Sequence, residues 1–447
     1  MKLKNSSKLF LKRMKGNEIA TKIVSNAGWL VGDKVVTMII GVFVMALVAR
    51  YLGPEKYGIY NYALAYVTLF TALSTLGLET LSVKSIVHKE EEEGTILFTS
   101  LVLRVIGGIV LTLFTSIIIR LVAPNEPLVH LLVMIMSFTM VIKSFEVIEY
   151  WIQAYQKSKI SSLIRIGAYI FSALLKVIFV FFEGDLFHLS LIYMLDSLII
   201  GIALVIAYFK NRTSYTKWKF KFQYAKKILS KSWYLILSGL MVTIYMQIDK
   251  VMLGSMLTDK KELGMYSAAT QIASMWYFVP LAIITSFQPI IMKKKLDTHE
   301  NYIGTIQLLY SIIAWIGILF GLLVIVFSDF IVSILYGQEY KNAADIITIS
   351  VWAGTFATLG SARSIWLLVE NLQKYTLVYT FVGLIINVGL NYLLIPIYGG
   401  FGAAFATLIA QVFTNVVTLA LFKKTRISSI MILKAFSPKY LFKLRKL

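Results

Sequence analysis

The sequence predicts an all-α membrane protein with about twelve transmembrane helices, arranged as two pseudo-symmetric six-helix lobes around a central cavity. Composition, span length and charge distribution predict this class. The 447 residues are 58% hydrophobic, with a mean hydropathy of +0.76, and still carry a formal charge of +21. A soluble core could not bury so much charge, because buried charges require partners. Apolar segments of about 20 residues, the length that crosses a bilayer, recur along the chain.

Twelve segments between Val24 and Phe422 are long and apolar enough to span the hydrocarbon core. They predict helices at residues 24–51, 57–79, 97–121, 128–153, 160–182, 187–209, 233–257, 264–292, 303–327, 345–369, 375–396 and 401–422. With both termini in the cytoplasm, about 31 lysines and arginines fall in cytoplasmic loops and about 4 in outer loops. The positive-inside rule predicts this bias. We therefore expect a multi-pass protein of the cytoplasmic membrane with both termini cytoplasmic.

The basic segments divide the predicted domains. An N-terminal lobe at 1–209 begins with a basic amphipathic stretch at 2–22, and a C-terminal lobe follows at 233–422. A cytoplasmic linker at 210–232 and a cytoplasmic tail at 423–447 are basic and interleaved with aromatic residues. This pattern favours binding to anionic membrane lipids over binding to nucleic acid. The absence of cysteine and the scattering of the four histidines predict no metal site and no cofactor.

The two halves share a layout. Gly58, Ile59 and Tyr60 follow a Gly-Pro turn after the first span, and Gly264, Met265 and Tyr266 stand about 206 positions later after the seventh. Six helices in each half keep both halves in one membrane orientation. The pattern predicts parallel repeats with a binding site between them, moving by alternating access.

Several motifs resemble those of the polysaccharide-unit flippases, the O-antigen and capsule translocases of the multidrug/oligosaccharidyl-lipid/polysaccharide (MOP) exporter superfamily. These are 49–60 (ARYLGPEKYGIY), 76–79 (LGLE), 249–254 (DKVMLG), 335–337 (LYG) with Tyr340, 391–399 (NYLLIPIYG) and 402–404 (GAA). The resemblance implies a two-lobed transporter that moves an undecaprenyl-pyrophosphate-linked oligosaccharide to the outer leaflet. It also implies a polymerase and glycosyltransferases of the same pathway as partners.

Ionisable residues inside the spans are costly and typically face a wet cavity or a partner. Cations in such a cavity would bind the pyrophosphate implied by the resemblance through charge-assisted hydrogen bonds. The predicted substrate-binding residues are Lys34, Arg104, Lys143, Lys176, Arg363 and Arg50. A structural role is the alternative for each: Arg50 and Arg165 lie near helix ends, where long side chains reach the interface, and Lys143 could pair with Glu146 three residues later.

The acidic residues within the spans are candidates for coupling to H+ or Na+. Asp33, Glu146 and Glu149 are placed to carry a proton or sodium ion, and Asp249, next to Lys250, is expected to find a partner in the other lobe. The acidic run from Glu90 is predicted to be a solvated helix cap without a transport role.

Other functions remain open as alternatives. A multidrug/cation antiporter of the same superfamily would favour an anionic cavity, whereas the charges within the spans are mostly cationic. A lipid II flippase would typically have two further helices. A glycosyltransferase or polymerase would need a catalytic acidic cluster outside the membrane, and the predicted outer loops are too short to build one. We therefore expect a transporter rather than an enzyme, and a scaffold for glycosyltransferases is the less economical alternative.

Overall fold

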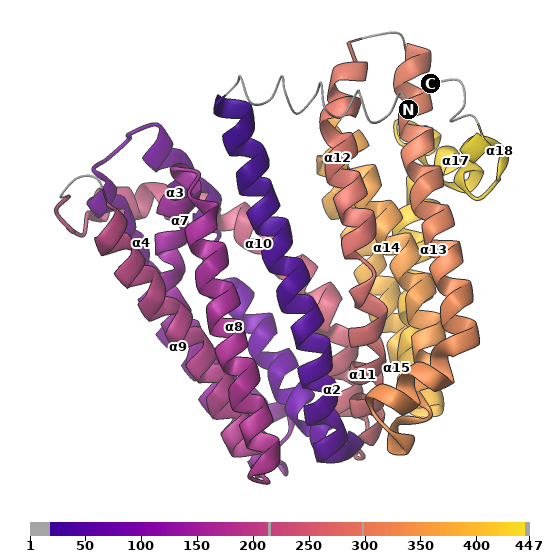
Figure 1. Cartoon of the computed structure of the whole chain (residues 1–447), viewed down its shortest axis with the longest axis horizontal. Coiled ribbons are helices and arrows are strands. Elements are labelled where there is room, and N and C mark those ends of the chain that lie inside the picture. The colour runs from indigo at the N-terminus through magenta and orange to yellow at the C-terminus, as the bar shows by residue number, and fades with distance from the viewer. Residues whose placement is uncertain (1–17, 213–215, 297–298, 443–447) are drawn as a thin grey trace. The chain divides into compact units, whose positions relative to one another are not determined.

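The computed structural model describes residues 18–212, 216–296 and 299–442 (Figure 1). All regular elements in these ranges are helical, which confirms the all-α prediction. They are α2 (Glu18–Ser74), α3 (Leu78–Val87), α4 (Glu93–Val122), α5 (Pro127–Ser137), α6 (Thr139–Ile142), η1 (Lys143–Val147), α7 (Ile148–Ala154), α8 (Ser158–Phe181), α9 (Leu186–Asn211), α10 (Phe222–Met256), α11 (Lys261–Met275), α12 (Phe278–Lys294), α13 (His299–Leu335), η2 (Gln338–Tyr340), α14 (Ala343–Val369), α15 (Lys374–Val412), η3 (Phe413–Val417), α16 (Thr418–Leu421), α17 (Arg426–Ala435) and α18 (Lys439–Phe442). Most of the predicted N-terminal amphipathic stretch, up to residue 17, and the tail after residue 442 lie outside the described ranges.

Ten stretches of the described chain are long and apolar enough to cross a membrane. Two of them each contain two crossings, which brings the number of crossings to the predicted twelve. The first, within α2, is kinked at Gly53, where φ is 72°, and the other, within α15, is kinked at Gly399, where φ is 54°. Glycine adopts positive φ without the steric penalty of a Cβ atom. The turn predicted at 52–56 is therefore a kink between two nearly continuous helices.

The chain packs as two compact units. Unit 1 contains the described residues up to Gly41 together with Phe70–Ile117 and Met134–Leu237, and unit 2 contains Val42–Leu69, Ile118–Val133 and the described residues from Ser238 onward. The units do not coincide with the two sequence halves, because parts of α2, α4 and α5 belong to the second unit. The lobe boundaries at 209 and 232 stay a prediction.

Unit 1 is built around an aromatic core. Trp151 and Tyr208 are buried there in an edge-to-face contact, with ring centroids 5.3 Å apart.

The predicted linker contributes to this unit. The backbone N–H of Lys221 donates to Thr99 Oγ1 at 3.2 Å, and the Lys221 ammonium bonds Glu91 at 2.6 Å. The end of the predicted linker is thus a packed segment, and α10 begins at Phe222, well before the predicted span.

Unit 2 has its own core, in which α13 lies against α14 and α14 against α15 (Figure 1). Part of the predicted basic tail forms α17 and packs on this core. Tyr310 Oη lies 3.0 Å from Ser428 Oγ, and Gln307 Nε2 donates to the carbonyl of Met431 at 3.0 Å. Polar contacts of this kind anchor α17 through groups that would otherwise be buried without partners.

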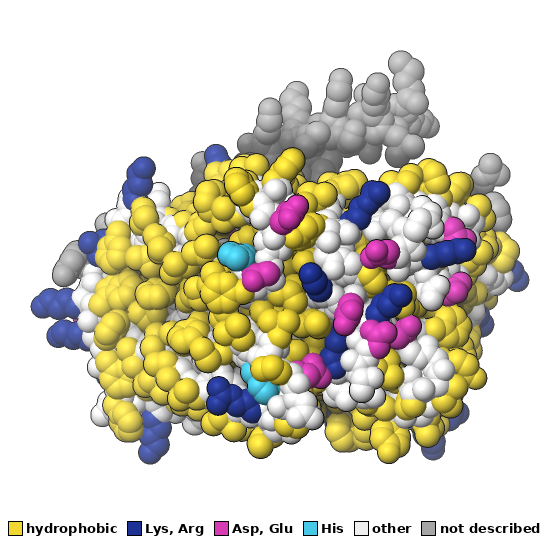
Figure 2. Space-filling view, turned by 90° about the horizontal axis from the view of Figure 1, so that it is seen from below, with side chains coloured by type: hydrophobic (Ala, Val, Ile, Leu, Met, Phe, Trp, Pro, Cys, Tyr) yellow, Lys and Arg dark blue, Asp and Glu magenta, His cyan; other side chains and the backbone are white. Residues whose placement is uncertain are grey.

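Large apolar side chains are exposed along the long helices. Leu113 on α4 is 61% exposed and Val326 on α13 is 72% exposed. Figure 2 shows hydrophobic side chains covering most of the surface seen in that view. Extensive exposed apolar surface is unfavourable in water and is what a lipid-facing surface requires.

Candidate functional site

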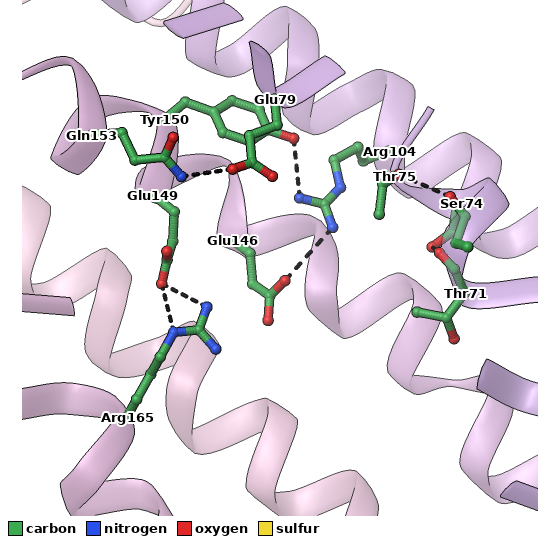
Figure 3. Close-up of polar contacts among 11 residues, drawn as sticks. Thr71, Ser74, Thr75, Glu79, Arg104, Glu146, Glu149, Tyr150, Gln153 and Arg165 are labelled. Carbon is green, nitrogen blue, oxygen red and sulfur yellow. Dashed lines mark hydrogen bonds and ion pairs between the residues drawn. The ribbon is translucent and has the colours of Figure 1, made fainter. Parts of the chain in front are cut away.

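Arg104 on α4 is buried in unit 1 and has acidic and phenolic neighbours (Figure 3). Its Nη1 donates to Tyr150 Oη at 3.3 Å, and its Nη2 forms an ion pair with Glu146 Oε2 at 3.8 Å. Glu146 lies in η1, the short 3-10 segment between α6 and α7. The alternative pairing of Glu146 with Lys143 is wrong, because the carboxylate bonds the neighbouring helix instead.

Arg165 on α8 forms the second ion pair of this cluster (Figure 3). Its Nε and Nη2 both donate to Glu149 Oε1, at 3.0 and 2.7 Å, and Ser161 Oγ donates to the same oxygen at 2.8 Å. Arg165 is thus bonded to a carboxylate, and its position relative to the membrane interface stays a prediction. Asp33 on α2 is buried, interacts electrostatically with Arg165, and has one carboxylate oxygen without a hydrogen bond. Three carboxylates thus face two guanidinium groups.

A cavity adjoins Asp33. It has a volume of about 420 Å³ and is lined by Trp29, Gly32, Asp33, Val36 and Ile166, among others. Lys34, the next residue, is exposed on α2. The cluster therefore combines three carboxylates and two guanidinium groups with a cavity that Asp33 lines.

Lys143 and Lys176 form a second group in unit 1. Lys143 Nζ lies 5.8 Å from the ring centroid of Tyr193, and Lys176 Nζ lies 5.8 Å from that of Tyr169. Both lysines are half-buried, and in the described part of the chain neither ammonium group has an ion pair or a hydrogen bond. Both interact electrostatically with Asp196 on α9. This group carries a net positive charge.

Asp249 on α10 is buried in unit 2 among neutral oxygen and nitrogen groups. It accepts hydrogen bonds from Tyr266 Oη at 2.6 Å, Asn391 Nδ2 at 2.6 Å and Thr407 Oγ1 at 2.5 Å. Among the described residues no cationic group lies within ion-pair distance of this carboxylate. The predicted partner in the other lobe is thus replaced by partners from its own unit. A cavity of about 80 Å³ beside Tyr266 and Thr407 leads to Gln411.

Arg363 on α14 is also buried in unit 2, without a carboxylate partner in the described chain. Its Nη1 donates to the carbonyl of Thr414 at 3.1 Å, and its guanidinium lies 5.2 Å from the ring centroid of Tyr379. Thr414 belongs to η3, a π-helical turn, and such turns are rare and frequently lie at functional sites. Arg50, the remaining predicted cation, is exposed on α2.

The six predicted cations are divided between the two units. Lys34, Arg104, Lys143 and Lys176 belong to unit 1, whereas Arg50 and Arg363 belong to unit 2. Their binding roles stay predictions.

The two matched turns of the sequence halves meet within unit 2. A Cβ atom added at Gly58 would lie 1.9 Å from the carbonyl oxygen of Lys260, and one added at Gly264 would lie 1.8 Å from that of Pro54. Gly264 and Lys260 stand 206 positions after Gly58 and Pro54. The contact is therefore reciprocal, as expected around a two-fold pseudo-symmetry axis, and only glycine fits on either side.

The family follows from comparison with known proteins. The family model described as polysaccharide biosynthesis protein matches residues 23–295, more than half of the chain. The chain belongs to the polysaccharide biosynthesis protein family. A second family model, MatE, matches residues 235–393. Both matches confirm the resemblance to the MOP exporter superfamily.

One curated relative of this polysaccharide biosynthesis protein is the probable low-salt glycan biosynthesis flippase Agl15 of Haloferax volcanii. The two are 24% identical over 221 residues, which is 49% of this chain and 46% of the relative. The match thus spans about half the length of that relative.

Solved structures with the same fold include the lipid II flippase MurJ in an inward closed conformation. It has 16% identity and a TM-score of 0.71, over 92% of this chain and 91% of that one. An inward-facing multidrug resistance MATE family transporter has 14% identity and a TM-score of 0.70, over 91% of this chain and 96% of that one. These likenesses confirm the transporter fold of this polysaccharide biosynthesis protein.

The sequence did not predict one buried ion pair, that of Lys260 with Glu126. Lys260, in a predicted outer loop, is only 6% exposed, and its ammonium donates to Glu126 Oε1 at 2.8 Å and to the carbonyls of Gly254 and Leu257 at 2.7 and 3.0 Å. The ammonium also lies 5.2 Å from the ring centroid of Tyr62. The sequence did contain a sign that Lys260 is buried, because this residue occupies the repeat position of Pro54 in the matched turn.

Proposed function

We propose that this protein is a flippase that moves undecaprenyl-pyrophosphate-linked oligosaccharide repeat units across the cytoplasmic membrane by alternating access, coupled to H+ or Na+. It would serve cell-surface polysaccharide biosynthesis, with both termini in the cytoplasm and with glycosyltransferases and a polymerase of the same pathway as partners. Membership of the polysaccharide biosynthesis protein family supports the pathway. The relative in Haloferax, itself described as a probable glycan flippase, supports the transport activity.

The observation that carries the substrate proposal is that Lys143 and Lys176 lie within the membrane spans without a bonding partner in the described chain. Ammonium groups within the membrane are expensive and typically pair with a partner. These two have no direct bonding partner in the described chain, and each sits near a tyrosine ring instead. A diphosphate headgroup would supply the missing acceptors through charge-assisted hydrogen bonds, and tyrosine rings suit the adjacent sugars.

The proposed ion-coupling residues are Asp249 first and Asp33 second. Asp249 accepts hydrogen bonds from hydroxyl and amide groups, and Asn391 Oδ1 beside it has no hydrogen bond. Oxygen ligands of this type suit a hard cation such as Na+. Asp33 also has an unpaired oxygen. Glu146 and Glu149 are already bonded to arginines, so we propose that they reach an ion only when those pairs open.

The test is complementation with a lysine variant. A bacterial strain lacking its own copy of this protein would express the wild type, the K143A/K176A double variant, or K424A as a control. Lys424 is an exposed lysine that follows the last span. We expect the double variant to reach the membrane and to lose at least about tenfold in surface polysaccharide, while K424A exports normally. Normal export by the double variant would contradict the proposal.

A cation-coupled drug exporter is the second candidate, and one observation favours it. The MatE family model covers the segment that contains Asp249 and Asn391. Drug susceptibility of the same strains separates the two functions. We expect no change in susceptibility when the wild type is removed, whereas a drug exporter would make the deletion strain more sensitive without affecting surface polysaccharide.

A further inference from the structure

Asp196 on α9 is the acidic group that Lys143 and Lys176 share. Its strongest electrostatic interaction is with Lys176 and the next is with Lys143. Despite this, the carboxylate makes no direct ion pair with either lysine, and its Oδ1 is buried without a hydrogen bond in the described structure. The three charged groups are thus close enough to interact but are not bonded to one another.

This arrangement differs from the ion pairs elsewhere in the same unit. Arg165 and Glu149 are bonded at 2.7 Å and leave little for a ligand to replace. Buried polar atoms are nearly always satisfied, so the buried Asp196 oxygen without a hydrogen bond is unusual, and the two half-buried lysines that interact with it are also unbonded in the described structure. The group also contains Tyr169, whose hydroxyl lies against Gly41 of α2, where a Cβ atom would come within 2.4 Å. The lack of a side chain at Gly41 leaves room for this tyrosine.

We infer that Asp196 is an internal counter-anion that competes with the substrate diphosphate for Lys143 and Lys176. This inference rests on the proposed function. With the site empty, the carboxylate partly neutralises the two ammonium groups. When the headgroup enters, its phosphate oxygens neutralise the two ammonium groups and compete with Asp196 for them. Asp196 therefore lowers the affinity of the site for the diphosphate, and it assists release by restoring a counter-charge.

The closing experiment measures binding of inorganic pyrophosphate to the full-length protein in nanodiscs of zwitterionic lipid. Four proteins are compared: the wild type, D196N, K143A/K176A and D329N. Asp329 is an exposed carboxylate on α13, so D329N repeats the same chemical change away from the group. We expect D196N to bind pyrophosphate at least about fivefold more tightly than the wild type and D329N to match the wild type. We expect K143A/K176A to lose binding, and D196N to transport more slowly in the complementation assay because release is impaired.

The outcomes separate the two proposals. Binding that is unchanged in K143A/K176A would overturn the lysine site and with it the proposed function. Binding that depends on the lysines but is equal or weaker in D196N would overturn the role of Asp196 alone. If D196N does not fold, D196S is the second neutral replacement, and failure of both would mean that Asp196 is required for packing, which also overturns the role.

A second arm addresses the source of the phosphate. Nanodiscs containing the anionic lipid phosphatidylglycerol should leave pyrophosphate binding nearly unchanged if the site takes a diphosphate headgroup. Loss of pyrophosphate binding in those nanodiscs would show that the lysines bind bulk lipid headgroups, and the counter-anion role toward the substrate would be wrong.

Discussion

Replacing Gly58 with alanine should weaken the contact between the two matched turns, at Gly58 and Gly264. The added Cβ atom would lie 1.9 Å from the carbonyl oxygen of Lys260 and 2.8 Å from its carbonyl carbon, whereas ordinary contacts begin at 3.4 Å. The backbone of one turn must therefore move by about 1.5 Å. Overpacking of this kind costs about 1 to 3 kcal/mol. If the contact forms in only one of two alternating conformations, a loss of about 2 kcal/mol shifts their ratio roughly thirtyfold toward the open one.

The assay uses the absence of cysteine from this protein. Ser267 on α11 is buried one turn after Gly264, and S267C changes only oxygen to sulfur. A membrane-impermeant maleimide added from outside should label S267C slowly. In the G58A/S267C protein the labelling rate should rise by at least about tenfold, because displacement of the matched turns loosens the packing at the start of α11.

The matched control is G389A in the same background. Gly389 lies in α15, and a Cβ atom there would meet nothing within 4 Å. Alanine at such a helical site is neutral or slightly stabilising, so its labelling rate should equal that of S267C alone. Equal labelling of the G58A and G389A proteins would refute the view that the glycine contact closes this side. A rise in both would point to general loosening of the fold rather than to the contact.

Three further changes have defined outcomes. K260M should lower the free energy of unfolding by about 2 to 4 kcal/mol, because the partly exposed Glu126 loses its partner. E126Q keeps a hydrogen-bond acceptor for Lys260, so this variant should lose less stability in a thermal unfolding measurement. D249N should abolish any Na+-dependent rise in the melting temperature of the purified protein. The hydrogen bond from Lys227 lowers the pKa of Glu90, so its ionised form stabilises the fold above the ordinary glutamate pKa of 4.5, and this is lost as pH falls through the lowered pKa. E90Q should therefore lower the melting temperature slightly near neutral pH and not in acid.

The apolar pattern of the sequence was sufficient to predict the membrane spans, but it was insufficient to predict which charged side chains pair with each other. Apolar length predicts a membrane helix because every backbone group in lipid must be bonded within the segment. Which side chains bond across helices depends on which helices are neighbours. The spacing of Lys143 and Glu146 suggested a pair, yet Glu146 bonds Arg104 of α4. Asp249 likewise bonds residues more than 140 positions away.

The repeat was visible in the sequence, but its contact was not. An offset of about 206 identified Gly58 and Gly264 as equivalent residues, and equivalence alone does not bring two residues together. Their meeting requires that both helical hairpins cross the membrane in the same direction and come together at the same end. The burial of Lys260 was hidden for the same reason, because its partner Glu126 lies in a different loop of the first half.

The two units hold their membrane charges in different ways, and this difference bears on where ligands can enter. Breaking a bonded pair such as Arg165 with Glu149 leaves a partly buried carboxylate without its partner, which is unfavourable. Asp249 is hydrogen-bonded by neutral groups and forms no ion pair in the described structure, so a cation can join it without breaking one. The unbonded charges of Lys143 and Lys176 can accept an anion on the same terms. We therefore expect the anion to bind at Lys143 and Lys176 in unit 1 and the coupling cation to bind first at Asp249 in unit 2, while the bonded pairs fix the helices that carry these sites.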